Sequence, residues 1–548
     1  MFRSNATSRN VTIVVTVLMM SCSRHGAFDL AVALPSGAAP RRCISCLRPY
    51  QSTRETFAET RTTAMSETEI RQDKSFFGHP RGLATLFGVE MWERFSFYGM
   101  QGILTIYLYY TAAQGGLGLS EATATSIVGA YGGLVYLSTV AGAWVADRVA
   151  GSERVLFTSA VLIMFGHLAL ALLPRFLGVG VGLGAVALGS GGLKANATSI
   201  VGSFYEKDDP RRDAGFSLFY LGVNLGAFVG PLLTGLVQKE VGFHYGFGLA
   251  ALGMALGLIH YMFGRKNLGP EANVVPNPLP SSRRPLVLGG LIVAIGVVVI
   301  AVLTGLITAA NLANVTVVVI AVAAASYFGV ILSSKKITRV ERSRVFGFVP
   351  MFLASFVFFS LFQQQFTVVT IYVDQRLDRS LFGWQMPVAW ANSINPIFII
   401  LLAGAFAALW TKLGPRQPST PIKFALGTVT MGIAFLLFLP TVGGAGNSTP
   451  LPVLVGILLM FTIAELLLSP VGLSLSTKLA PEAFRTQMVA LNFLSIALGT
   501  SMAGSLAKYY DPADEARYFT FVGGAAVLFG LLLAAASPFI KRLMKGVP

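Results

Sequence analysis

The sequence predicts an all-α integral membrane protein with fourteen transmembrane helices. Of its 548 residues, 54% are hydrophobic and only 12% are charged, whereas soluble domains carry about 25% charged residues. The apolar residues form segments of about 20, the length with which an α-helix crosses the hydrocarbon core of a bilayer. Segments of about 10 residues with alternating polarity, which would predict a transmembrane β-barrel, are absent from the sequence.

The hydrophobic segments follow one another in groups of six, two and six. The first group lies at 82–110, 122–146, 154–174, 177–201, 214–237 and 245–264. A polar, proline-rich linker follows, and then two very apolar segments at 285–308 and 311–333. The last group lies at 344–371, 386–411, 420–441, 451–478, 485–507 and 518–540.

This order predicts the domain organisation. We expect a short cytoplasmic N-terminus at 65–81 and an N-terminal six-helix bundle at 82–264. A linker with two extra transmembrane helices at 265–343 would lead to a C-terminal six-helix bundle at 344–548.

Residues 1–64 differ in composition from the rest and are expected to be an extension outside the membrane core. They are rich in arginine, poor in acidic residues, and hold all three cysteines of the chain, so no disulfide framework supports the membrane body. Two interpretations stay open. The segment is either a misassigned start, with Met65 opening the working protein, or a targeting segment that is removed.

The net charge of +16 does not predict a nucleic-acid-binding protein, because Lys and Arg lie in short loops between hydrophobic segments. Placing the N-terminus inside puts most of these cations in the inner loops, for example Lys335, Lys336 and Arg339. The positive-inside rule therefore predicts a multi-pass protein of the cell membrane with both termini in the cytoplasm.

The first hydrophobic segment contains "EMWERFSFYG", in which Glu90, Glu93 and Arg94 interrupt the apolar run. One charge at the bilayer centre costs about 3 kcal/mol on insertion scales, so these side chains must face a bundle interior. At 100° per residue, Tyr98 and Gln101 share their helix face. A structural ion pair would need only one carboxylate. The second carboxylate predicts a functional cluster that takes up and releases protons.

Polar residues in other segments complete a dipolar arrangement. Lys194 in "GSGGLKAN" lies in the fourth segment, Asn224 in "FYLGVNLGAF" in the fifth, and Glu465 in "FTIAELLLSP" in the segment 451–478. Two cations from the N-terminal half, Arg94 and Lys194, would thus face one anion from the C-terminal half. This separation of charge favours a zwitterionic substrate, and the absence of an ATP-binding motif favours a proton gradient as the energy source.

Two six-helix halves joined by a basic linker are typical of major facilitator transporters. The loop "GAWVADRVAGSER" resembles the loop signature of that superfamily through Gly142, Asp147, Arg148 and Gly151. We expect the charges of this loop to hold helix ends together rather than to contact a substrate.

More specific motifs resemble those of the proton-dependent oligopeptide transporters, the peptide branch of this superfamily. They are "EMWERFSFYG", "GSGGLKAN", "RRDAGFSLFYLGVNLGAF", "WANSINPIF" and "AELLLSPVGLSLSTKLAP". The resemblance runs in family order from about Phe76 to the C-terminus, and bacterial members of the family also have two extra helices between the halves.

The resemblance implies a role for each motif residue. The proton-coupling cluster would consist of Glu90, Glu93, Arg94 and Lys194. In substrate binding, Arg94 and Lys194 would hold the peptide C-terminus. The peptide N-terminus would be held by Asn224, Asn395 and Glu465, and the pocket would be lined by Tyr98 and Tyr136.

Four positions depart from the family pattern. Many members have a basic residue at Gln101 and a glutamate at Gln363, so the sequence predicts a neutral Gln–Gln pair at the outer gate. Losing both charges together avoids leaving one ion without a partner. Where relatives often have tryptophan, this chain has Phe359 and Asn492, which predicts a roomier and more polar pocket near Asn492.

The sequence as a whole predicts a proton-coupled symporter that imports di- and tripeptides by alternating access. We expect no enzymatic activity, no metal and no cofactor besides the coupling proton. The expected partners are short peptides and the lipid bilayer, with no nucleic acid, and the protein is expected to work as a monomer. Open alternatives are another substrate on the same scaffold (a peptide-like drug, nitrate or an acidic metabolite), a drug–proton antiporter, and a peptide sensor.

Overall fold

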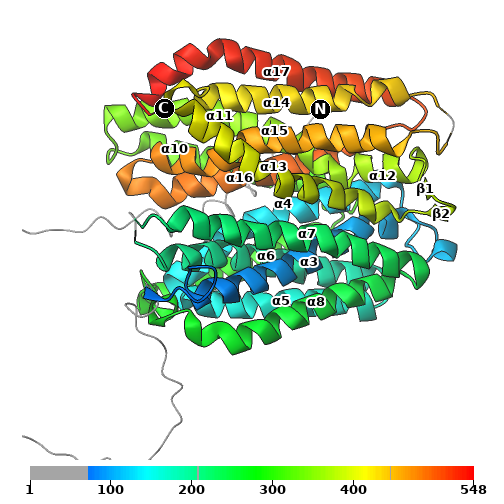
Figure 1. The fold of residues 1–548 in the computed structure, drawn as a ribbon. Coiled ribbons are helices and arrows are strands. Elements are labelled where there is room, and N and C mark those ends of the chain that lie inside the picture. Colours follow the sequence, from blue (N-terminus) through cyan, green and yellow to red (C-terminus); the bar gives the residue numbers. More distant parts are fainter. Residues whose placement is uncertain (1–71, 207–208, 445, 548) are drawn as a thin grey trace, which may run out of the picture.

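The computed structural model describes residues 72–206, 209–444 and 446–547, so the predictions about residues 1–64 lie outside the described residues. Long helices run side by side in two layers, an N-terminal bundle and a C-terminal bundle (Figure 1). Thirteen helices of the described part are long and apolar enough to cross a membrane. The fourteenth is the charged α3 (Arg81–Tyr109). The predicted all-α membrane fold is therefore confirmed.

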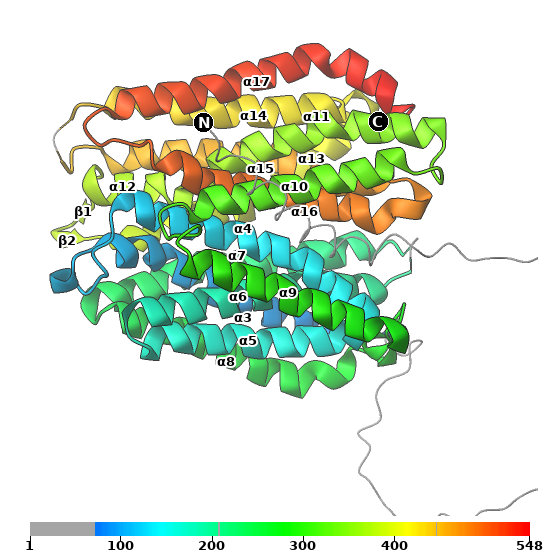
Figure 2. The same cartoon turned by 180° about the vertical axis from the view of Figure 1, so that it is seen from behind.

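The N-terminal bundle contains six helices. They are α3, α4 (Glu121–Val145), α5 (Ser152–Leu172), α6 (Arg175–Ser203), α7 (Arg212–Glu240) and α8 (Phe243–Gly264). The extra helices are α9 (Arg284–Leu303) and α10 (Leu312–Ser333). Helix α10 packs on α4 and on α16 (Arg485–Ala507) of the C-terminal bundle. Figure 2 shows α9 and α10 along one face of the molecule, and α9 has no buried residue.

The C-terminal bundle is built from α11 to α17. Besides α16 it contains α11 (Arg339–Phe362), α12 (Val368–Gln375), α13 (Ile394–Leu413), α14 (Thr420–Leu436), α15 (Leu451–Lys478) and α17 (Glu515–Met544). A small hairpin of β1 (Ser380–Leu381) and β2 (Trp384–Gln385) follows α12. We call the end of the bundles that carries this hairpin the hairpin end, and the opposite end, where residues 265–283 leave α8, the linker end (Figure 1).

The segment predicted as one helix at 344–371 is broken in two. A 3-10 turn, Gln363–Phe366, separates α11 from α12, and Thr367 takes φ −125° and ψ −98°. Side chains satisfy carbonyls that the break leaves without helical partners: Thr370 donates to the Gln365 carbonyl at 2.7 Å, and Thr105 of α3 donates to the Phe366 carbonyl at 2.5 Å. The bond from Thr105 comes from the other bundle, so the hydropathy of the segment 344–371 could not predict the break.

Glycines allow the helices that hold the charged residues to approach closely. Gly222, Gly226 and Gly230 recur every four residues on α7, and a Cβ atom at any of them would collide with α3. At Gly226 the collision would involve the Met91 carbonyl and the Cβ of Arg94. The glycine-rich run at 222–230 therefore serves close helix packing, and it places α7 directly against the charged part of α3.

The loop between α4 and α5 is held by the linker. Asn277 donates from its side chain to Asp147 Oδ1 at 3.0 Å and from its backbone to the Asp147 carbonyl at 3.0 Å. Arg148 lies 3.4 Å from Asp147 Oδ2. The expectation that these charges hold helix ends is therefore corrected in part, because in this conformation Asp147 binds the linker at Asn277.

The two bundles approach backbone to backbone at α4 and α16. A Cβ at Gly129 would lie 2.5 Å from the Gly504 Cα, whereas a Cβ at Gly180 of α6 would meet no atom within 4 Å. Gly129→Val should therefore destabilise the protein by about 1–3 kcal/mol through overpacking, seen as a lower midpoint of thermal unfolding in detergent. Gly180→Val, with the same loss of backbone freedom, should change the midpoint little. Equal midpoints for both variants would contradict this role of Gly129.

Hydrogen bonds within the described residues join the two bundles between mid-helix and the hairpin end. They link Thr105 to the Phe366 carbonyl, Tyr109 and Tyr110 to Asp374, Gln375 to Glu121, Lys239 to the Gln385 carbonyl, Trp390 to the Leu232 carbonyl, and Ser393 to the Phe228 carbonyl. The bundles are thus fastened to each other at the hairpin end.

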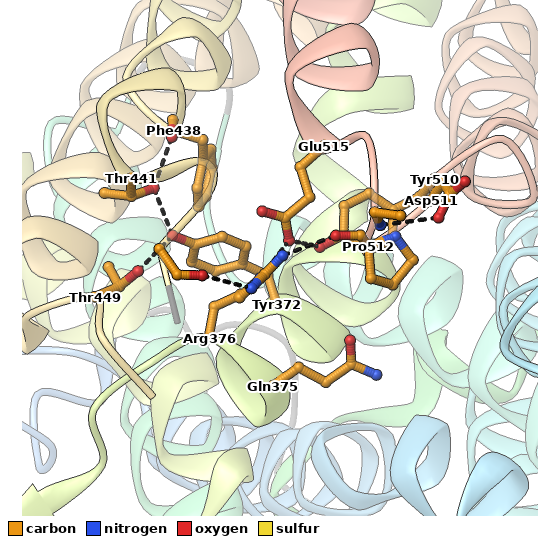
Figure 3. Close-up of polar contacts among 12 residues, drawn as sticks. Tyr372, Gln375, Arg376, Phe438, Thr441, Thr449, Tyr510, Asp511, Pro512 and Glu515 are labelled. Atoms are coloured by element: carbon orange, nitrogen blue, oxygen red, sulfur yellow. Dashed lines mark hydrogen bonds and ion pairs between the residues drawn. The ribbon is translucent and has the colours of Figure 1, made fainter. Parts of the chain in front are cut away.

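The end of α12 faces both bundles. Asp374 and Gln375 bind the N-terminal bundle, whereas the next residue, Arg376, is anchored in the C-terminal bundle. The Arg376 guanidinium donates to Glu515 at 2.9 Å and to the Pro512 carbonyl at 2.7 Å, and Tyr510 donates to the same carboxylate at 2.6 Å. Figure 3 shows how these side chains lie. This anchor fixes α12 to its own bundle, so that Asp374 and Gln375 present their side chains to the other one.

Candidate functional site

The three charges predicted on α3 form one buried cluster. Arg94 lies between the two carboxylates, with Nη2 2.8 Å from Glu90 Oε1 and Nε 3.0 Å from Glu93 Oε2. The side chains are 4%, 6% and 0% exposed for Arg94, Glu90 and Glu93. The spacing i, i+4 brings Glu90 and Arg94 together on one helix face. Glu93 reaches the same guanidinium from the adjacent position.

The cluster leaves acceptor capacity unused. Arg94 Nε donates to Glu90 Oε1 at 2.9 Å, so its N–H is directed away from Glu93 Oε2, which has an ion-pair contact but no hydrogen bond. The other oxygen of Glu93 accepts a bond from Ser190 Oγ of α6 at 3.0 Å. Glu90 Oε2 is also buried without a hydrogen bond. Two carboxylates therefore share one guanidinium, and either of them has an oxygen able to hold a proton.

Lys194 of α6 lies between aromatic rings. Its Nζ is 4.6 Å from the centroid of the Tyr136 ring and 4.9 Å from that of Phe97. Within the described residues, no carboxylate lies within 4.0 Å of this nitrogen. The cation is thus close to the α3 cluster without belonging to its ion pairs.

The anionic side of the site lies on the C-terminal bundle. Glu465 is near the middle of α15, and its Oε2 accepts a hydrogen bond from Asn395 Nδ2 of α13 at 3.2 Å. The same amide nitrogen also donates to Thr462 Oγ1 at 3.0 Å. No Lys or Arg within the described residues forms an ion pair with Glu465. The structure therefore brings Asn395 and Glu465 together, as two residues predicted to bind the same end of a substrate.

Tyrosines lie between the cationic and anionic sides. Tyr98, Tyr136 and Tyr220 are each near enough to Glu465 to interact with it electrostatically. The Tyr98 ring stacks on Phe366, with centroids 6.0 Å apart. Phenol hydroxyls donate and accept hydrogen bonds, so this layer offers partners for a polar molecule that spans both sides.

Two residues of this region were missed by the sequence reasoning. Ser190 lies four residues before Lys194, and Tyr220 lies four residues before Asn224, so in each case the helical period places the pair on one face. Tyr220 is 42% exposed although it lies within a membrane-spanning helix. The Asn224 amide donates to the Tyr220 carbonyl at 2.9 Å, so part of its hydrogen-bonding capacity is directed into its own helix.

Gln101 and Gln363 have different surroundings in this conformation, and the predicted Gln–Gln pair at the outer gate stays a prediction. Gln363 begins the 3-10 turn after α11, and its side chain is within hydrogen-bonding reach of Tyr136. Gln101 Oε1 is buried without a hydrogen-bond partner. Helices α3 and α12 are joined closer to the hairpin end. There the hydroxyls of Tyr109 and Tyr110, at the end of α3, donate to Asp374.

The site places the cations on the N-terminal bundle and the anion on the C-terminal bundle, and the two bundles are joined mainly at the hairpin end. Such a site suits recognition of a molecule with a carboxylate and an ammonium, and it places exchangeable protons beside the cations. Within the described residues, no group of three or more His, Cys, Asp or Glu side chains has the arrangement of a metal site.

Comparisons with known proteins agree with this architecture. The model of the POT family matches residues 153–522. The di-/tripeptide transporter of Lactococcus lactis subsp. lactis (strain IL1403) is 40% identical over 499 residues, which cover 87% of this chain and 99% of the relative.

Two solved structures are similar over nearly the same region. A mutant form of a peptide transporter POT, in complex with alafosfalin, superposes with a TM-score of 0.82 at 45% identity, covering 88% of this chain and 100% of that one. A POT family transporter in complex with 5-aminolevulinic acid has a TM-score of 0.82 at 40% identity, covering 87% and 100%. From the family match and these relatives together, we conclude that the chain belongs to the POT family of membrane transporters.

Proposed function

We propose that this protein is a proton-coupled symporter that imports di- and tripeptides by alternating access. The observation that carries the proposal is the division of charge across the site. The cations Arg94 and Lys194 lie on the N-terminal bundle, whereas Glu465, which has no cationic partner among the described residues, lies on the C-terminal bundle. A peptide carboxylate would pair with the two cations, and the peptide ammonium would pair with Glu465 held by Asn395. Tyr98, Tyr136 and Asn224 would contact the backbone between these ends.

The relatives support this class of substrate. One is named as a di-/tripeptide transporter, and a solved relative holds 5-aminolevulinic acid, which combines an amino and a carboxyl group in one small molecule. A nitrate ion or a lipophilic cation would leave either Glu465 or the two cations without a partner inside the membrane, which is costly.

Proton coupling follows from competition for one guanidinium. Glu90 and Glu93 share Arg94 in the described conformation. If a peptide carboxylate binds Arg94, three anions compete for it, and a proton on Glu93 or Glu90 relieves the repulsion. Peptide and proton therefore stabilise the same loaded state, as symport requires. In the reverse step, loss of the proton restores the Arg94–carboxylate pairs and expels the peptide.

The hydrogen bonds between the bundles suggest which conformation the structure represents. The loops rich in Lys and Arg lie at the linker end, and the positive-inside rule assigns this end to the cytoplasmic side of the cell membrane. Both termini would then be cytoplasmic. Because these inter-bundle hydrogen bonds lie toward the opposite, hairpin end, we assign the conformation as inward-facing. We propose that a monomer is the transporting unit, with 82–264 and 344–548 as its two moving halves.

The outer gate is part of the proposal. Gln101 and Gln363 lie between the charged cluster and the hairpin end and would adjust their hydrogen bonds as the bundles move. Gln363 contacts Tyr136 in the described conformation, which would connect the gate to the substrate site.

The test is dialanine-driven proton uptake in proteoliposomes that contain a pH-sensitive dye. The wild type should acidify the lumen when dialanine is added under an inside-negative potential, and nitrate or a lipophilic cation should not replace the peptide. Glu93→Gln should lose this proton uptake while retaining dialanine counterflow exchange, because the glutamine amide mimics the protonated acid but cannot release a proton.

Each alternative gives a different result. Dialanine binding without accumulation in the vesicles would indicate a sensor, and drug efflux driven by inward proton flow would indicate an antiporter. A wild type that neither binds nor accumulates dialanine would refute peptide transport, and a Glu93→Gln variant with normal proton uptake would move the coupling role elsewhere.

A further inference from the structure

The ring of Phe97 lies between the two cations of the site. It is 4.9 Å from Lys194 Nζ and 5.7 Å from the Arg94 guanidinium carbon, measured to the ring centroid. Tyr136 of α4 flanks the same ammonium at 4.6 Å. Lys194 thus contacts two aromatic rings from two different helices. It does so even though an anion that could pair with it, the Glu93 carboxylate, belongs to the neighbouring cluster.

The orientation of Phe97 is held from its other sides. Its ring stacks on Tyr131, with centroids 6.1 Å apart and an angle of 28° between the planes. It also meets the Tyr98 ring edge-on, with centroids 5.2 Å apart. The residue is 5% exposed. The ring is therefore packed on several sides, and a ring packed in this way can hold a cation in one place.

An aromatic ring is a suitable partner for a cation that must stay available. The ring quadrupole attracts an ammonium without neutralising its charge, so the Lys194 ammonium is held without an ion pair to any carboxylate of the described residues. A direct ion pair with Glu93 would satisfy Lys194 but would have to be broken whenever a substrate carboxylate arrives. Glu93 is meanwhile occupied by Arg94 and by Ser190.

We propose that Phe97 is a positioning residue which, together with Tyr136, holds the Lys194 ammonium apart from Glu93 and ready for the carboxylate of the substrate. This inference rests on the proposed function and deepens it, because it assigns the recognition of the carboxylate end to a cation placed by aromatic rings. Without the Phe97 ring, Lys194 would be free to pair with Glu93, and the substrate carboxylate would lose one of its two cations.

The experiment compares two competitors of dialanine counterflow exchange in proteoliposomes: unlabelled dialanine and alanyl-alaninamide, which lacks the C-terminal carboxylate. Phe97→Leu, which keeps an apolar side chain but removes the ring, should raise the half-inhibitory concentration of dialanine about tenfold. The half-inhibitory concentration of alanyl-alaninamide should stay within about twofold of the wild-type value, since the amide has no carboxylate for Lys194 to bind. Phe97→Tyr keeps the ring and should retain the wild-type value for both competitors.

Phe95→Leu is the matched control. Phe95 lies on the same helix, is 4% exposed, and packs edge-on against Trp92 with centroids 5.6 Å apart. No Lys or Arg of the described part of the chain lies over its ring. The Phe95→Leu variant should change the half-inhibitory concentrations of dialanine and of alanyl-alaninamide to a similar small extent. If Phe97→Leu yields no folded protein, Phe97→Met, with a comparable apolar volume and no ring, takes its place.

Three results would overturn the inference: unchanged dialanine inhibition in Phe97→Leu, equal weakening of dialanine and its amide, or failure of Phe97→Tyr to retain wild-type inhibition. Equal weakening would mean that Phe97 only supports the packing of α3. A wild type in which dialanine neither exchanges nor competes would instead refute the proposed function, and this inference with it.

Discussion

Arg94→Leu is expected to abolish dialanine uptake, with a loss of about 100-fold or more, and to lower the stability of the folded protein. Arg94 is 4% exposed and contacts both Glu90 and Glu93. Removing one partner of a buried ion pair typically costs about 3–5 kcal/mol, because the remaining charge keeps its desolvation cost. In this variant two carboxylates lose their partner at once, and the substrate carboxylate loses a cation.

The pH dependence gives this prediction a second check. Protonation of a carboxylate left without a partner removes its charge, so the loss of stability in Arg94→Leu should shrink as the pH is lowered. The midpoint of thermal unfolding in detergent, measured from neutral to acidic pH for wild type and variant, reports this trend. Arg154→Leu is the control, because Arg154 is exposed and forms no ion pair within the described residues. A constant difference between Arg94→Leu and wild type at all pH values would contradict the assigned cause.

Asp374→Asn is expected to release the fastening at the hairpin end. The carboxylate of Asp374 accepts hydrogen bonds from the hydroxyls of Tyr109 and Tyr110, the latter at 2.8 Å, and pairs with Arg379 at 3.2 Å. Hydrogen bonds to charged groups contribute about 1.5–3 kcal/mol each. Weakening this cluster should therefore shift the population toward conformations open at the hairpin end by about 10–100-fold, since about 1.4 kcal/mol corresponds to a factor of ten.

A cysteine introduced at Ala389 measures this shift. Ala389 is fully buried, and its Cβ lies 3.4 Å from the position that a Cβ at Gly102 of α3 would take, so it lies where the bundles meet near the hairpin end. Its rate of maleimide labelling should rise about 10–100-fold in Asp374→Asn. The cysteines of residues 1–64 are counted as background from the chain without the new cysteine.

Asp378→Asn serves as the control, because Asp378 is exposed and accepts a bond from the Ser380 backbone of its own turn. Equal labelling rates in wild type, Asp374→Asn and Asp378→Asn would mean that the Tyr109–Tyr110–Asp374 contact does not hold the gate. The function of the gate would then rest with other contacts, such as those of Gln101 and Gln363.

Local chemistry along the chain was sufficient for the fold class and for much of the candidate site. Segment length and apolarity predicted the helices, because a bilayer admits few other structures. The cost of charge in hydrocarbon made Glu90, Glu93 and Arg94 conspicuous, and the helical period placed them on one face. The same period, applied to Lys194 and Asn224, would also have indicated Ser190 and Tyr220, which lie one helical turn earlier.

Contacts between distant parts of the chain decided the rest. The break at Gln363–Phe366 depends on a bond from Thr105, and the fastening of the hairpin end joins Tyr109 to Asp374, which are 265 residues apart in the chain. Only the packing of α6 against α3 and α4 placed Lys194 between Phe97 and Tyr136. Periodicity reports which face of a helix is buried, but not which neighbour covers that face. For that reason the residue types of the site were visible in the sequence, whereas their partners emerged only from the tertiary structure.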